Sequence, residues 1–238
     1  TDIPVVSYHL NVMNCGEKLG YPIRKGGLCN GFTMRWIEAV LSKTEEIFHA
    51  RLENIIRLND RFCEGYTIEE LIKEKEFSET ELLDIKAFYE SLLLYQDGEI
   101  SSLILEKPTN QDDVDKLSNI ASSDETILSG GIKTTPPLYY GNFDKKDISF
   151  CLNALQEKIL ASGEQKPVTF LLSLMTPSGD LHAVSMVFNP NEKKWKFMDV
   201  NTFPPTTLSN SDDLIGSLPT HFFRSFTLTG ICLGDDFN

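Results

Sequence analysis

The sequence is short of positive charge and of long apolar runs. Its 238 residues carry 22 Lys and Arg against 35 Asp and Glu, a formal net charge of −13 at pH 7. Nucleic acids and anionic membranes are bound by clustered basic side chains, and the sequence contains no basic stripe. No apolar run approaches the roughly 18 residues of a membrane-spanning helix. We therefore expect no nucleic-acid partner, and nothing in the sequence indicates membrane contact.

Cysteine is also scarce and shows no pattern. The five residues form an odd number without a C-x-x-C pair: Cys15, Cys29, Cys63, Cys151 and Cys232. Disulfide frameworks and zinc sites need regular spacing of their ligands. The phosphate-binding motif G-x-x-x-x-G-K-[ST] and the hydrolase motif G-x-S-x-G are both missing. We therefore expect neither a metal nor a cofactor.

What is present is ordinary globular composition, with helical patterns in the first two thirds of the chain. Apolar residues recur at helical spacing from Phe32 to about Leu58, directly after the turn-rich stretch at 26–31. Before that stretch, residues 1–25 predict an extended segment and loops. A further helical pattern covers 67–95, with a break near Phe77 and a capping box Ser78-x-x-Glu81 after it. A short helix near 111–121 and a longer one from Asp147 to about Leu160 are also expected.

The character of the chain changes at Pro167. Residues 168–175, 181–188 and 194–200 predict three strands joined by tight turns, and 221–232 predicts one or two more. Helices followed by hairpin-connected strands are typical of an α+β protein with an antiparallel sheet.

Cys29 is the candidate nucleophile. It lies at the predicted start of the long helix, where the helix dipole and unpaired backbone N–H groups favour a thiolate. Two glycines precede it, and we expect them to let a substrate backbone approach closely. A buried structural cysteine at this place is the competing interpretation of the residue taken alone.

His182 and Asp199 are the candidate partners. His182 lies near the start of the second predicted strand and Asp199 near the end of the third. Antiparallel neighbours can place the two side by side, so that Asp199 accepts from one ring nitrogen while the other faces Cys29. Asn201 has the same strand parity as Asp199 and is the alternative orienting residue.

Three motifs in this order resemble a known family. Gly27-x-Cys29 is followed by Trp36 seven residues later, His182-Ala183-Val184 begins the strand, and Asp199-x-Asn201 ends the next one. The chain thereby resembles the papain-like cysteine proteases of the YopT and AvrPphB type, found in secreted bacterial effectors. Position 23, close to where such enzymes carry an oxyanion-stabilising Gln or Asn, is Ile. Asn11, Asn14 and Asn30 remain alternative donors.

The resemblance implies a papain-like α+β fold, with a helical lobe packed on a twisted antiparallel sheet and the active site between them. We expect one domain over 1–238 with a helical insertion at about 64–146, excised from a longer effector that can carry a targeting or repeat module.

The resemblance also implies a function. A Cys29, His182 and Asp199 triad would hydrolyse peptide or isopeptide bonds of a host protein, after secretion by a bacterium into the host cytoplasm. The same triad supports transglutaminase or deamidase chemistry. A catalytically silent protein-binding module is the second class of function, because the upstream Gln is missing and the 64–146 segment is long.

Overall fold

A computed structural model describes residues 7–24, 26–96, 130–219 and 223–234. These residues fall into two compact units. The first is helical and consists of the described residues up to 96 together with Val200–Phe203, and the second contains the sheet and is built from residue 130 onward without that segment. Among the described residues, no helix is both long enough and apolar enough to span a membrane.

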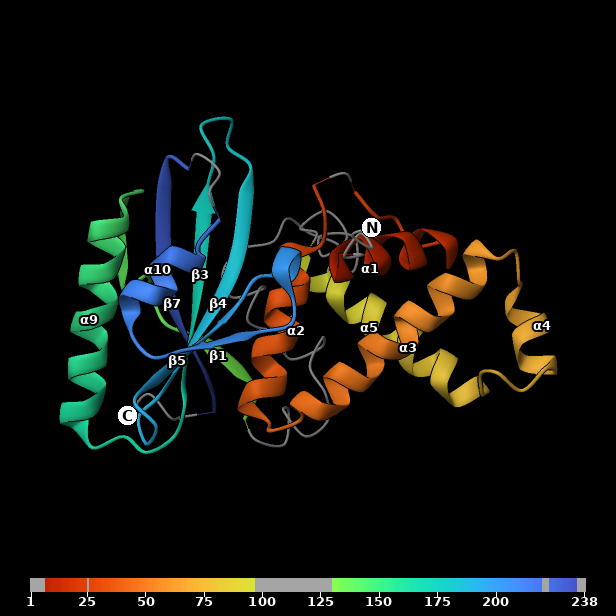
Figure 1. The fold of residues 1–238 in the computed structure, drawn as a ribbon, viewed down its shortest axis with the longest axis horizontal. Helices are drawn as coiled ribbons and strands as arrows, with labels where there is room; N and C mark the ends of the chain where they lie inside the picture. Colours follow the sequence, from red (N-terminus) through yellow and green to blue (C-terminus); the bar gives the residue numbers. More distant parts are fainter. Residues whose placement is uncertain (1–6, 25, 97–129, 220–222, 235–238) are drawn as a thin grey trace, which may run out of the picture. The chain divides into compact units, whose positions relative to one another are not determined.

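The helical unit is built from five helices and one short 3₁₀ turn (Figure 1). Helix α1 packs along α3, and α2 packs along α5. Large side chains fill the space between them, so that Trp36, Phe32, Phe48 and Tyr89 are fully buried. The elements are α1 (Tyr8–Lys18), α2 (Cys29–Leu41), α3 (Glu45–Cys63), α4 (Ile68–Lys73), α5 (Glu79–Gln96) and η1 (Val200–Thr202).

The single long helix predicted over 32–58 is in fact two helices. α2 ends at Leu41 and α3 begins at Glu45. Between them Lys43 has a φ of 58°, a left-handed conformation that no helix interior allows. The Ser42 hydroxyl donates to the Glu38 carbonyl at 2.6 Å and satisfies one of the last carbonyls of α2. The apolar periodicity continues across this turn, which is why the sequence pattern did not reveal it.

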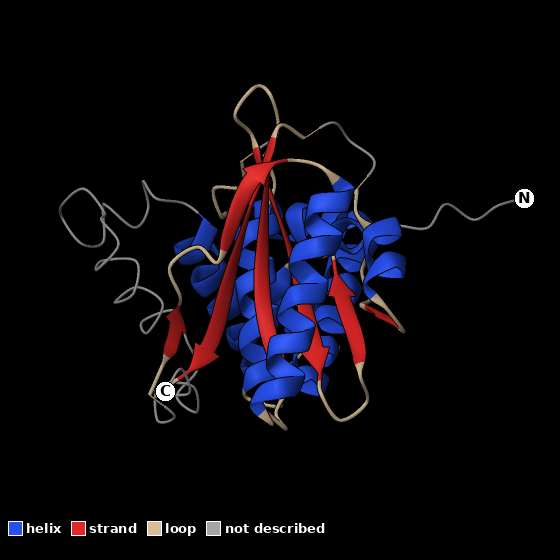
Figure 2. Cartoon of the chain, turned by 90° about the vertical axis from the view of Figure 1, so that its left-hand side faces the viewer, coloured by secondary structure: helices blue, strands red, loops and turns tan. Residues whose placement is uncertain are grey.

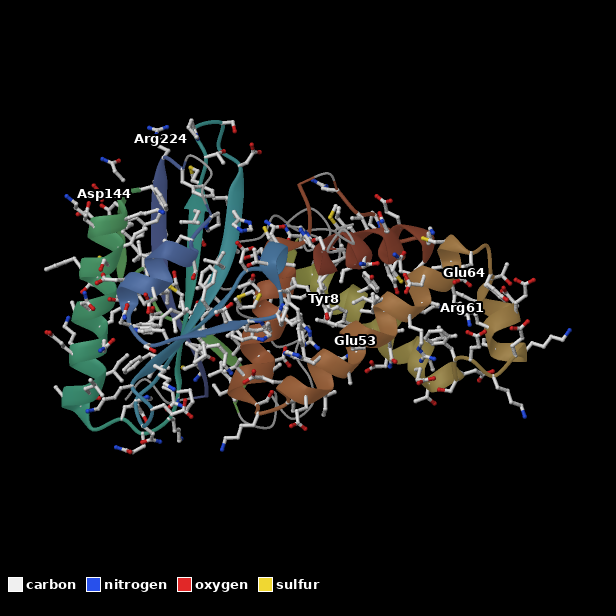
Figure 3. All side chains as sticks on the ribbon, in the orientation of Figure 1. Tyr8, Glu53, Arg61, Glu64, Asp144 and Arg224 are labelled. Atoms are coloured by element: carbon white, nitrogen blue, oxygen red, sulfur yellow. The ribbon has the colours of Figure 1, made fainter. Side chains whose placement is uncertain are left out.

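The prediction that residues 1–25 are extended was also wrong, because Tyr8–Lys18 forms α1. This helix buries only a narrow strip, and its N-cap Ser7 makes no side-chain capping bond. Contacts with the rest of the unit stabilise it instead. Tyr8 and Glu53 point toward each other from α1 and α3, and the phenol donates to the carboxylate at 3.0 Å (Figure 3). Tertiary packing thus overrides a weak local signal.

The second unit is a seven-stranded antiparallel sheet with helices α9 (Lys145–Ser162) and α10 (Ser211–Ser217), which confirms the predicted α+β class. The strand order is β1-β7-β3-β4-β5-β6, and β2 pairs with β7 beside β1. Figure 2 views the sheet from the side that α9 covers. The strands are β1 (Ile132–Thr134), β2 (Tyr139–Asn142), β3 (Val168–Met175), β4 (Leu181–Asn189), β5 (Lys194–Met198), β6 (Thr206–Leu208) and β7 (Ser225–Leu233).

The predicted strands at 168–175, 181–188 and 194–200 correspond to β3, β4 and β5, and the predicted C-terminal strand is β7. The face covered by α9 and α10 holds the apolar core, where Trp195 and Phe197 lie on the same side of β5. Helix α9 begins before the predicted start, because the side chain of Asp144 caps it by accepting from the Lys146 amide. The short elements β1, β2, β6 and α10 were not predicted.

The segment expected to be an insertion, about 64–146, contributes to both units. Its first part forms α4 and α5, and α5 buries Leu82, Ile85 and Phe88 in the helical core. Its last part forms β1 and β2, which both pair with β7. The possible helix near 111–121 lies outside the described residues.

Candidate functional site

Cys29 is the first residue of α2 and is 5% exposed. Its predecessor Leu28 is the N-cap, with φ −120° and ψ 22°, and its side chain cannot cap the helix. The Leu28 carbonyl accepts from the Phe32 amide at 2.9 Å, which starts the helical hydrogen-bond ladder. The expected position of Cys29 at a helix N-terminus is therefore observed.

Side chains from other helices supply the caps that Leu28 lacks. The Leu28 amide donates to His9 Nε2 at 3.0 Å, from α1. The Gly31 amide donates to Gln96 Oε1 at 2.9 Å, from the end of α5. Two backbone donors on either side of Cys29 and Asn30 are thus satisfied by residues that the sequence analysis did not single out as functional. Their roles depend on contacts between residues far apart in the chain, for which the sequence carries no local signal.

The glycines around Cys29 have packing roles. Gly27 has a φ of 85°, and a Cβ at this position would lie 2.7 Å from His9 Cε1. A Cβ at Gly31 would lie 2.2 Å from the Leu92 carbonyl oxygen. Gly27 therefore leaves room for the His9 imidazole, and Gly31 lets α2 approach α5 closely. The packing of His9 explains Gly27 without the close approach of a substrate backbone that was expected from the sequence.

His182 and Asp199 lie together within the sheet unit. His182 Nε2 is 3.1 Å from Asp199 Oδ1, and their side chains are 16% and 4% exposed. His182 pairs with Leu174 near the start of β4, and Asp199 directly follows β5, the neighbouring antiparallel strand. The juxtaposition expected from the hairpin geometry is therefore present. Desolvation of the carboxylate strengthens this hydrogen bond.

Phe223 is an aromatic neighbour of the His182 ring. The two rings are nearly parallel, with an interplanar angle of 13° and a centroid distance of 6.5 Å. Phe223 is itself 4% exposed and belongs to the apolar core under α9 and α10. The imidazole is therefore restrained by an aromatic neighbour as well as by the carboxylate.

Three of the four asparagines named as alternatives have other partners, and the fourth, Asn14, is exposed on α1. Asn201, in η1, accepts through Oδ1 from His9 Nδ1 at 2.9 Å within the helical unit. Asn30 Nδ2 donates to the Tyr95 carbonyl at 2.8 Å and ties α2 to α5. Asn11 forms a buried pair, in which its Oδ1 accepts from Asn59 Nδ2 at 2.9 Å. These contacts give all three residues structural roles.

The remaining cysteines differ from Cys29 in their surroundings. Burial raises the pKa of the Cys15 thiol to about 12. Burial, and then the charge of Asp147, also raise the pKa of Cys151. Cys63 is exposed at the end of α3, and Lys18 Nζ donates to its sulfur at 3.2 Å. In the described ranges, His, Cys, Asp and Glu form no cluster that could hold a metal ion.

Comparison with known proteins gives a distant structural likeness. No family model matches the sequence, and no curated protein matches it. The structure is similar to the Pseudomonas avirulence protein AvrPphB, with a TM-score of 0.46 and 11% sequence identity, over 88% of this chain and 93% of that one.

Proposed function

We propose that this chain is a cysteine protease that hydrolyses peptide or isopeptide bonds in a host protein through Cys29, His182 and Asp199. The observation that carries the proposal is the buried hydrogen bond between His182 Nε2 and Asp199 Oδ1. A carboxylate on one nitrogen of an imidazole is the arrangement that orients a general base in thiol and serine hydrolases. Cys29 at the first position of α2 is the matching nucleophile, and the motif order supports this assignment.

The chemistry assigns one task to each atom. Asp199 accepts from Nε2–H, which leaves Nδ1 of His182 as the nitrogen that takes the thiol proton. The Cys29 thiolate attacks the carbonyl carbon, and the imidazolium returns its proton to the leaving amine as the C–N bond breaks. Water then attacks the thioester, with His182 accepting its proton, and the Cys29 thiol is regenerated as the acid is released.

The developing oxyanion needs donors that are already in place. We assign the Cys29 backbone N–H to this task, since it belongs to the first turn of α2 and points along the helix dipole. The side chains of Asn30 and Asn201 are engaged by the Tyr95 carbonyl and by His9. These contacts hold both side chains in place, and we assign the second donor to neither of them.

Alkylation of Cys29 by iodoacetamide tests the proposal. The reference protein carries Cys63→Ser, because Cys63 is exposed and would otherwise react. We expect Cys29 to react rapidly near neutral pH, and to react more slowly in His182→Ala by roughly the fraction of thiolate that is lost. A Cys29 that reacts equally with and without His182 would point to the silent binding module.

The resolving nucleophile distinguishes the enzymatic alternatives. Peptide hydrolysis yields a new protein amino terminus in an extract of host cells, and isopeptide hydrolysis frees a lysine side-chain amine. Transamidation incorporates an added primary amine, and deamidation converts Gln to Glu. The motif resemblance further supports delivery of the protein by a bacterium into the host cytoplasm. Detection of the protein in the host cytosolic fraction during infection tests that assignment separately.

A further inference from the structure

His9 is held between two partners inside the helical unit. Its Nε2 lies 3.0 Å from the Leu28 amide nitrogen, and its Nδ1 lies 2.9 Å from Asn201 Oδ1. Leu28 directly precedes Cys29, and its carbonyl is bound by the Phe32 amide. The imidazole therefore binds the amide of Leu28, while the carbonyl of the same residue accepts the first backbone hydrogen bond of α2.

These contacts determine the protonation state of the ring. A backbone N–H can only donate, so Nε2 must carry a lone pair. The single proton of the neutral ring is then on Nδ1, where it donates to the carbonyl oxygen of Asn201. A protonated ring would present a second N–H toward the Leu28 N–H and lose that hydrogen bond. Gly27 leaves room for the ring at this place, since a Cβ there would lie 2.7 Å from His9 Cε1.

We infer that His9 is a positioning residue, a neutral imidazole that fixes the N-terminal turn of α2 and so aims the Cys29 thiol. Asn201 selects the tautomer in which His9 can accept from Leu28. This inference rests on the proposed function, because it matters only if Cys29 is the nucleophile. It extends the site from three residues to five and gives Asn201 a role other than orienting His182.

Three variants test whether the hydrogen-bond acceptor at residue 9 matters or only the shape of its side chain. His9→Gln keeps an oxygen acceptor that cannot be protonated at neutral pH, whereas His9→Phe keeps a ring without an acceptor. Asn201→Asp keeps the acceptor for Nδ1–H but places a carboxylate beside it, which favours the cationic ring and opposes the contact with Leu28. All variants carry Cys63→Ser, and thermal melts report whether each one folds.

The measurements are the rate of Cys29 alkylation by iodoacetamide and the ¹⁵N resonances of the His9 ring. At pH 7 we expect a neutral ring protonated on Nδ1. We expect His9→Phe to slow alkylation on the order of 10- to 100-fold, because a thiol that is no longer aimed at His182 loses the partner that holds it as a thiolate, and His9→Gln to retain most of the rate. Asn201→Asp should slow alkylation when residue 9 is His, and should have no effect in the His9→Gln protein.

The outcomes distinguish this inference from the proposed function. A ring protonated on Nε2, or an Asn201→Asp effect that persists unchanged in His9→Gln, overturns the positioning role. Alkylation that depends on His182 but not on residue 9 overturns it too, and leaves the proposed function intact. Alkylation that is independent of His182 overturns the proposed function itself. If His9→Phe does not fold, the Asn201→Asp and His9→Gln pair still decides.

Discussion

The carboxylate of Asp199, directly after β5, lies 3.1 Å from Nε2 of His182 on the neighbouring strand β4. Asn201, two residues later, accepts from His9 within the helical unit. Two neighbouring polar residues with the same strand parity therefore have different partners. The chain turns into η1 directly after Asp199, which ends the strand periodicity that made them equivalent.

Asp199→Asn should slow Cys29 alkylation near neutral pH on the order of 100-fold, because an amide does not stabilise the imidazolium of the thiolate–imidazolium pair. The loss should be steepest on the alkaline side, where the imidazolium persists only with the help of the carboxylate. The pH profile of Cys29 alkylation in the Cys63→Ser protein measures both effects. Asp180→Asn, in the exposed hairpin turn between β3 and β4, is the control carboxylate and should match the parent protein. An unchanged profile in Asp199→Asn would contradict the orienting role.

Gly27→Ala should destabilise the protein by more than about 1 kcal/mol, since a side chain is strained at positive φ and the new Cβ meets the His9 ring. Gly20→Ala is a matched control, because Gly20 has a φ of 89° and nothing lies within 4 Å of the place its Cβ would take. Urea denaturation of both variants isolates the contact with His9. Equal losses in the two proteins would show that only backbone strain matters at position 27.

The capping box of α5 should make stability depend on pH. Glu81 Oε2 accepts from the Ser78 amide at 2.8 Å, and the Glu81 amide donates to Ser78 Oγ at 3.1 Å. The Ser78 backbone bond, and then its hydroxyl, lower the pKa of Glu81. The stabilisation is therefore complete above the ordinary Glu pKa of about 4.3 and is lost as the pH falls below it, toward the lowered folded value.

Two substitutions test the capping box. Ser78→Ala should cost about 1 kcal/mol at pH 7. Glu81→Gln should lower the melting temperature more at pH 7 than at pH 3, because the carboxylate becomes protonated in the parent protein as the pH falls. Glu79→Gln removes another first-turn carboxylate of α5 and controls for the helix dipole. A Glu81→Gln deficit of the same size at both pH values would refute the assignment.

Cys63 and Cys15 should react in a defined order in the native protein at pH 8. Cys63 is exposed and should be alkylated by iodoacetamide. Cys15 is fully buried, and with a pKa raised to about 12 it should stay unmodified until the protein unfolds. Peptide mapping by mass spectrometry, with and without urea, measures the order. Modification of Cys15 in the native protein would indicate local opening of the contact between α1 and α3.

The sequence predicted well where the determinants were local. Alternation and turn residues between 168 and 198 give β3, β4 and β5, and the same strand geometry brings His182 to Asp199. The Ser78 capping box is likewise a four-residue pattern. α1 was missed because its support comes from α3, and the end of α2 was missed because apolar periodicity runs through the turn at Lys43.

The capping role of His9 was beyond local inference. Its partner Asn201 is 192 residues away in sequence, and its other partner is a backbone amide, which leaves no trace in residue identity. β1 and β2 were missed for a related reason. They are short strands in the middle of the sequence, and their pairing partner β7 comes only after β3 to β6 and α10.

Val200–Phe203 belongs to the helical unit although its flanking residues belong to the sheet unit. Phe203 contributes its ring to the aromatic group of Tyr8, Phe32 and Phe48, with centroid distances of 5.1, 5.5 and 6.3 Å. During synthesis the N-terminal helices therefore leave the ribosome long before the residues that complete their core. The helices α1 to α5 are translated before β3, β4 and β5, but their core is completed only by residues that follow β5. Truncated chains that stop before residue 200 carry an open aromatic core.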